Sequence, residues 1–151
     1  MSTSHRLSEL GIELPEVVAP LAAYVPAVRT GNLVYTSGQL PVVAGKLGVT
    51  GKVGADVSAE DAKELARTCA LNALAAVHAL VGIDAVVRVV KVVGFVASAP
   101  GFNGQPGVVN GASELFGEVF GDAGAHARSA VGVSELPLDA PVEVEIVVEV
   151  A

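Results

Sequence analysis

The sequence predicts an α+β fold, a two-layer sandwich in which two helices cover one face of a mixed sheet of five or six strands. Two segments show helical spacing and the other apolar segments are β-prone, so the order is β-β-α-β-α-β-β. Helices with one apolar stripe bury it against a sheet face. The 151 residues contain no linker or repeat, and we expect a single domain over residues 1–151.

The N-terminal part predicts an arm and then a hairpin. Pro15 and Pro20 disfavour regular structure, so residues 1–18 are expected to form an irregular arm. Gly31-Asn32 is a turn signal between two β-prone runs. These runs cover residues 24–28 and 33–36.

Both helices are marked by their ends. The Gly-rich residues 41–56 predict a loop, after which Ser58 is suited to cap a helix that stops at Gly82. Residues 109–120 predict the second helix, which ends at Gly121.

Three long strands complete the sheet. Residues 86–98 are a β-branched run without polar alternation, which predicts a strand covered on both faces, and Gly94 within it indicates a bulge or a close backbone approach. Residues 126–133 and 142–150 form the last two strands, and the final one alternates Val or Ile with mostly Glu. The Glu face is either solvated or meets another subunit. The doubly apolar strand favours a homo-oligomer.

Composition excludes several classes of function. The net charge is −7 and basic residues form no run, which argues against nucleic acid as a partner. Cys69 is the only cysteine and the histidines are scattered, so we expect no disulfide and no metal site. No apolar leader is visible, and the apolar residues 68–83 are too short to cross a membrane. We expect a cytoplasmic protein that binds no membrane.

Arg128 is the strongest candidate for chemistry. It lies among small residues, and strand alternation places His126, Arg128 and Ala130 on one face. The planar guanidinium is suited to bidentate capture of a carboxylate. A structural ion pair between Arg128 and a Glu of the chain is an equally good interpretation.

Two motifs identify a family resemblance. The first is Gly31-Asn-Leu-Val-Tyr-Thr-Ser-Gly-Gln-Leu-Pro41. The second is Ala127-Arg-Ser-Ala-Val-Gly-Val-Ser-Glu-Leu-Pro137, followed by Val142-Glu-Val-Glu145. Together they resemble the RidA/YjgF family, formerly labelled endoribonuclease L-PSP. The segments Gly94–Pro100 and Asn110–Glu114 are similar to one less-characterised branch of it.

The resemblance implies a chorismate-mutase-like fold and a homotrimer with active sites in the clefts between subunits. It also implies hydrolysis of 2-aminoacrylate and related enamine or imine acids to 2-keto acids and ammonia, without a cofactor. By position, Arg128 matches the arginine that holds the substrate carboxylate, and Glu143 matches the acid that positions or activates water. Tyr24 matches a cleft tyrosine, and Ser37-Gly38 lines the same pocket.

The sequence departs from the family pattern at the pocket. Ala130 stands where active members often have Cys, and His126 stands where Pro is common. The loop of residues 99–108 is longer than in the typical deaminase. These departures bear on which substrate the pocket accepts.

Three functions follow from the sequence. The leading hypothesis is an imine or enamine deaminase. The alternative is a non-catalytic trimer that senses small carboxylates. The ribonuclease label is the third, and the acidic charge speaks against it.

Overall fold

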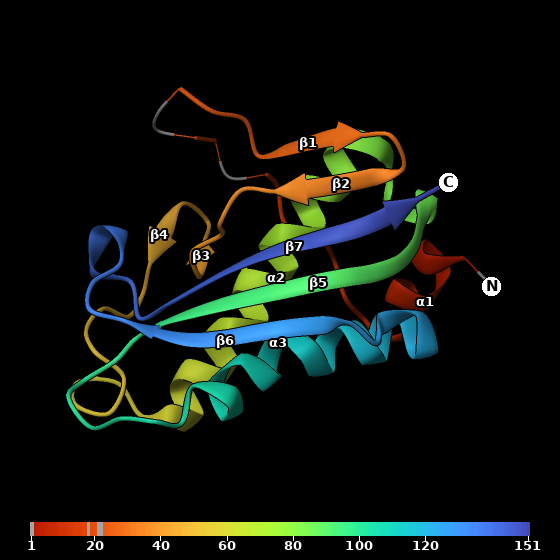
Figure 1. Ribbon diagram of the computed structural model, residues 1–151. Helices are drawn as coiled ribbons and strands as arrows, with labels where there is room; N and C mark the ends of the chain where they lie inside the picture. Colours follow the sequence, from red (N-terminus) through yellow and green to blue (C-terminus); the bar gives the residue numbers. More distant parts are fainter. Residues whose placement is uncertain (1, 18, 21–22) are drawn as a thin grey trace.

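The computed structural model describes residues 2–17, 19–20 and 23–151, and its elements follow the predicted order with additions (Figure 1). The helices are α1 (Thr3–Glu9), α2 (Ala59–Val81) and α3 (Gln105–Phe120). The strands are β1 (Ala27–Thr30), β2 (Leu33–Thr36), β3 (Val42–Val43), β4 (Lys46–Leu47), β5 (Val86–Ala97), β6 (Ala127–Val133) and β7 (Val142–Val150). Short 3-10 turns occupy Ile83–Ala85, Gly121–Gly124 and Pro137–Asp139.

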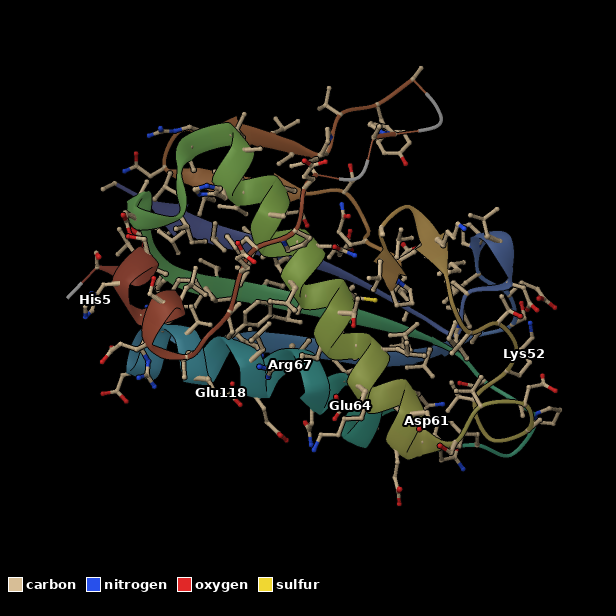
Figure 2. The ribbon with its side chains drawn as sticks, turned by 180° about the vertical axis from the view of Figure 1, so that it is seen from behind. His5, Lys52, Asp61, Glu64, Arg67 and Glu118 are labelled. Atoms are coloured by element: carbon tan, nitrogen blue, oxygen red, sulfur yellow. The ribbon has the colours of Figure 1, made fainter. Side chains whose placement is uncertain are left out.

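The main sheet has five strands in the order β1-β2-β7-β5-β6. β5 and β6 run parallel and the other neighbours antiparallel, so the sheet is mixed, as predicted. α2 and α3 cover one face: they lie behind the sheet in Figure 1, and Figure 2 shows α2 in front of it from the opposite side. The predicted two-layer α+β sandwich is confirmed.

The core lies between the helices and the sheet. Val142, Val144, Ile146, Val148 and Val150 of β7 are all buried there, which confirms the predicted alternation of the last strand. Gly94 lets α3 approach β5 closely, because a Cβ at Gly94 would overlap the methyl groups of Val109. The predicted close approach at Gly94 is therefore confirmed. The bulges of β5 lie nearer its start, between Val86 and Lys91.

Helix ends follow local capping chemistry. The Ser58 side chain accepts a hydrogen bond from the Asp61 amide at 3.1 Å, and Gly82 ends α2 with a φ of 81°. α3 begins at Gln105, four residues before the predicted start. Pro106 occupies its first turn, where a proline needs no amide hydrogen bond.

The prediction of an irregular arm over residues 1–18 is wrong for its first part, because α1 lies there. Met1 and Val18 of that arm lie outside the described residues. The amide and hydroxyl of Ser4 both donate to the Asp84 carboxylate at 2.7 Å, and Leu7 is buried. A seven-residue helix is marginal on its own, so these contacts with a distant segment stabilise it.

Two further boundaries differ from prediction. The first hairpin strand begins at Ala27 instead of residue 24, and the segment 41–56 contains the β3–β4 hairpin instead of only loop. Ala44, at the turn of this hairpin, has a φ of 51°, which is unusual for a residue with a side chain.

The sheet face opposite the helices is partly apolar. Val28, Tyr35 and Val131 are exposed on it, beside Glu143 and Glu145. The solvent side of the helices is instead charged: in Figure 2 the labelled Arg67 of α2 lies beside Glu118 of α3, and the two form an ion pair at 3.2 Å.

Candidate functional site

Arg128 lies on β6 opposite Val92 of β5, a core residue, so its side chain faces the helix layer. Its Nη1 donates to Asn110 Oδ1 at 2.7 Å and to Ser113 Oγ at 3.2 Å. Its Nη2 donates to the Pro106 carbonyl at 3.4 Å. Three acceptors from α3 therefore hold the guanidinium in one orientation.

Among the described residues, Arg128 makes no ion pair with a carboxylate. All its partners are neutral oxygens, so the structural ion pair allowed by the sequence is not formed within this part of the chain. A guanidinium has five N–H donors, and the Nε–H and one Nη2 hydrogen have no acceptor here. These two donors, Nε–H and Nη2–H, can bind a carboxylate through two parallel hydrogen bonds.

His126 extends the network around Arg128. Its Nδ1 lies 2.6 Å from the Gly124 carbonyl, which can only accept, so Nδ1 carries the hydrogen. In the neutral ring Nε2 is then an acceptor, and Ser113 Oγ donates to it at 2.9 Å. Phe116 packs edge-on against the ring. A directional chain of hydrogen bonds thus runs from Arg128 through Ser113 to His126.

Glu143 lies on β7 and faces the other side of the sheet, opposite Phe95. It is half-buried, and this desolvation raises the pKa of its carboxyl above the ordinary value of 4.5, with the negative charge of Glu145 as a second cause. The carboxyl packs against Gly38, where a Cβ would lie 2.7 Å from Glu143 Cδ. A carboxylate with a raised pKa is suited to accept a proton from water.

Tyr24 and Gly38 line one cavity of about 790 Å³. Ser37 is not among its lining residues. Its hydroxyl donates to the Val25 carbonyl at 2.6 Å and its amide donates to the Pro26 carbonyl at 2.8 Å. Ser37 therefore anchors the chain next to Tyr24, and its direct contact with a substrate stays a prediction.

The structure divides the predicted site into two parts. Arg128, His126 and Ala130 lie on the helix side of β6, with Ala130 partly buried against the core. Glu143 lies on the opposite sheet face, two strands away. Adjacent strands are about 4.8 Å apart, so β6 and β7 are separated by roughly 10 Å. The two residues are also offset along the strands, because Arg128 pairs with Val92 and Glu143 with Phe95, and they lie on opposite faces of the sheet. One chain does not bring Arg128 and Glu143 together.

Asn110 and Ser113 were not predicted as site residues. They are polar residues three positions apart on a helix whose neighbouring positions Val109 and Ala112 are buried. This spacing places them on one helix face, and it was the signal that could have found them. Asn72 was also missed: its amide donates to two backbone carbonyls at the wall of the cavity.

Within residues 2–17, 19–20 and 23–151, no group of three or more His, Cys, Asp or Glu side chains is placed to hold a metal ion. In the same part of the chain, no helix has the length and apolarity needed to cross a membrane.

Known structures share this fold. The protein Atu1372 of Agrobacterium tumefaciens, described as having unknown function, is 47% identical with a TM-score of 0.90, covering 99% of this chain and 92% of that one. TdcF of Escherichia coli, solved with bound serine, is 26% identical with a TM-score of 0.63, covering 91% and 93%. The fold and its neighbours define an α+β protein of the YjgF type.

Proteins with similar sequences belong to the same family as these structural neighbours. Residues 4–150 match the family described as "YjgF/chorismate_mutase-like, putative endoribonuclease". Protein TCP17 of Trypanosoma cruzi is 46% identical over 147 residues, 95% of this chain and 91% of that protein. The 2-iminobutanoate/2-iminopropanoate deaminase of Escherichia coli K12 is 36% identical over 129 residues, 85% and 88%. The chain belongs to the RidA/YjgF family, as its two motifs predict.

Proposed function

We propose that this protein hydrolyses reactive enamine and imine acids of the 2-aminoacrylate type to 2-keto acids and ammonia, without a cofactor. The observation that carries the proposal is the Arg128 guanidinium, which α3 holds through neutral acceptors and which has two donors without an acceptor among the described residues. A relative named as a 2-iminobutanoate/2-iminopropanoate deaminase supports the same chemistry.

The proposal requires a homotrimer, because Arg128 and Glu143 lie on opposite sides of the sheet within one chain. In a trimer, the Arg128 part of one protomer faces the Glu143 and Gly38 part of its neighbour. The partly apolar open sheet face, with Val28, Tyr35 and Val131, supplies surface that such contacts would bury. The proposal also includes the cytoplasmic location that the sequence predicts.

The reaction needs little from the protein. An enamine acid first takes a proton at its terminal carbon and becomes the iminium. Water then adds to the iminium carbon: Glu143 takes one water proton, a C–O bond forms, and the C=N electron pair moves to nitrogen, which gives a neutral amino alcohol. Glu143 returns its proton to that nitrogen, and the C–N bond then breaks as the hydroxyl proton is lost to solvent, so that ammonia and the 2-keto acid leave. Arg128 and Glu143 supply orientation and one proton acceptor.

The test couples the protein to a serine or threonine dehydratase that releases 2-aminoacrylate, and measures pyruvate formation. Wild type is expected to accelerate it, and Arg128→Ala to lower kcat/KM by about 100-fold or more, because the carboxylate is no longer oriented. Arg88→Ala is the matched control, since Arg88 is an exposed arginine on the neighbouring strand β5. Wild type that accelerates neither this reaction nor the hydrolysis of other amino-acid-derived imines refutes the proposal.

A second candidate function is a trimer that binds small carboxylates without turnover. The separation of Arg128 from Glu143 favours it, since the Arg128 part can hold a carboxylate by itself. This function predicts that a 2-keto acid raises the Tm of wild type and not of Arg128→Ala, while no imine is hydrolysed.

A further inference from the structure

His126 lies immediately before β6, at a position where the family commonly has a proline, and its ring is held by two other segments. Its Nδ1 lies 2.6 Å from the Gly124 carbonyl, and Phe116 of α3 meets the ring edge-on, with the ring centroids 6.0 Å apart. Gly124 in turn packs tightly on α3, because a Cβ there would lie 2.7 Å from the Phe116 carbonyl carbon. The backbone of one segment and a side chain of another therefore fix the imidazole in place.

The fixed ring determines the direction of the Ser113 hydroxyl. Because the Gly124 carbonyl accepts the Nδ1 hydrogen, the neutral ring offers Nε2 as an acceptor, and Ser113 donates to it at 2.9 Å. A serine inside a helix otherwise tends to donate to the carbonyl four residues earlier, here that of Val109. His126 thus competes with the Val109 carbonyl for this hydrogen and keeps the hydroxyl directed towards β6.

The direction of this hydroxyl matters because Arg128 uses the same oxygen. Arg128 Nη1 donates to Ser113 Oγ at 3.2 Å and to Asn110 Oδ1 at 2.7 Å, so both Nη1 hydrogens have an acceptor. The remaining bond, to the Pro106 carbonyl, is long at 3.4 Å. Two acceptors on one nitrogen fix the plane of the guanidinium. If Ser113 Oγ leaves its position, the guanidinium can turn about the bond to Asn110, and its Nε–H and Nη2–H donors no longer face a carboxylate in one orientation.

Histidine suits this position because it is an acceptor without a negative charge. A carboxylate in the place of the imidazole would attract the guanidinium and compete with the carboxylate of a ligand. The two glutamates of α3, Glu114 and Glu118, form ion pairs at 3.2 Å with Lys63 and Arg67 of α2 instead of with Arg128. Among the described residues, no carboxylate therefore competes for the positive charge of Arg128.

We propose that His126 is a positioning residue for carboxylate capture: it acts on Arg128 through the Ser113 hydroxyl and does not itself contact the substrate. This role rests on the proposed function and adds a residue to the machinery of the same site. The three hydrogen bonds that lead from Gly124 to Arg128 all lie within one chain, so they do not depend on how protomers assemble. The side chain that stands in place of proline supplies an acceptor that proline lacks.

Two variants separate the two hydrogen bonds of the ring. His126→Gln extends far enough for its carboxamide to accept from Ser113, as Nε2 does, whereas His126→Asn extends only as far as Nδ1 and keeps the bond to Gly124. In His126→Asn, the apparent KM for 2-aminoacrylate and the Kd of pyruvate, measured by calorimetry, are expected to rise about tenfold, the effect of one hydrogen bond, while kcat changes little. Both constants of His126→Gln are expected to stay within about threefold of wild type.

The tautomers of the histidine rings give a second readout that needs no ligand. Heteronuclear NMR of wild type at alkaline pH, where imidazole rings are neutral, is expected to show the His126 hydrogen on Nδ1. His78 is the internal reference, because its Nδ1 accepts from the Ile83 amide at 3.0 Å and its hydrogen therefore lies on Nε2. His78→Asn keeps an acceptor for that amide, so its KM and Kd are expected to match those of wild type.

The proposal is overturned if His126→Asn binds pyruvate as tightly as His126→Gln or more tightly, since a ring that only fills space gives no advantage to the longer carboxamide. A His126 hydrogen on Nε2 overturns it as well, and this measurement on wild type stands even where a variant fails to fold. If wild type hydrolyses no imine, the proposed function fails, and pyruvate binding by wild type and the two variants then decides the role of His126 by itself. Wild type that binds no pyruvate overturns that role.

Discussion

Replacing Gly38 by Ala tests whether the position of Glu143 determines catalysis. The added Cβ would lie 2.7 Å from Glu143 Cδ, whereas ordinary contact begins at 3.4 Å. The carboxyl group must therefore retreat by at least 0.7 Å (3.4 − 2.7), and by more at Oε2, which lies nearer. A misplacement of about 1 Å at a reacting group costs roughly 100-fold in rate. We expect kcat of Gly38→Ala to fall by about that factor.

Stability should respond far less than activity. The colliding atoms belong to the end of a flexible side chain, so a rotamer shift of about 0.5–1.5 kcal/mol relieves the overlap. Gly38 has no positive φ, and alanine offsets about 0.4–1 kcal/mol of this cost by restricting the unfolded chain. The free energy of unfolding should therefore stay within about 1 kcal/mol of wild type, as measured by urea denaturation.

The assay is the dehydratase-coupled formation of pyruvate, with Gly48→Ala as control because an added Cβ there meets nothing within 4 Å. A double-mutant cycle then isolates the cause. If Gly38→Ala acts by displacing Glu143, it has no further effect in a Glu143→Ala background. Full activity of Gly38→Ala, or a second 100-fold loss in that background, would refute the reasoning.

Three other predictions follow from the same contacts. Gly111→Ala should lower the free energy of unfolding by about 2–3 kcal/mol, because the added Cβ would lie 2.9 Å from a backbone carbonyl carbon of α2. Gly117→Ala on the same helix is the control: its added Cβ has no atom within 4 Å, so this change should be neutral or stabilising. The raised pKa of Glu143 means that the folded state binds this proton more tightly than the unfolded state. Ionisation of Glu143 therefore lowers the free energy of unfolding as pH rises from 4.5 through the pKa of Glu143 in the folded state. Denaturation curves at several pH values should show the free energy of unfolding of Glu143→Gln increasing relative to that of wild type over this pH range. Ser113→Ala removes an acceptor from the arginine and a donor to His126, so KM should rise more than kcat falls, with partial rescue by Ser113→Thr in steady-state kinetics.

Local signals in the sequence predicted most of the sheet and the main helices. The Gly31-Asn32 turn, the Ser58 cap and the β-branched run of residues 86–98 each depend on interactions within a few residues, so their physical cause is readable from the sequence. The helix α1 was missed because seven residues do not sustain a helix alone. Its stabilising partner, Asp84, lies 80 positions away from Ser4.

In the candidate site, too, local sequence predicted some features, and others depend on contacts between distant segments. The motifs around Arg128 and Glu143 identified the residue types, because a guanidinium and a carboxylate have their chemistry wherever they lie. They did not predict which partners hold Arg128. Asn110 and Ser113 meet it only because α3 packs against β6, and helix packing depends on contacts between segments distant in sequence.

The sequence by itself determined the alternation of the last strands, the lone arginine among small residues and the family to which the chain belongs. Only the tertiary structure decided that Arg128 and Glu143 lie on opposite sides of the sheet, since this depends on the registers of β6 and β7 against β5, where a one-residue slip reverses every side chain. It also decided that the Glu143 carboxyl lies against Gly38, at the edge of a cavity. Register and packing are long-range properties, and local sequence does not encode them.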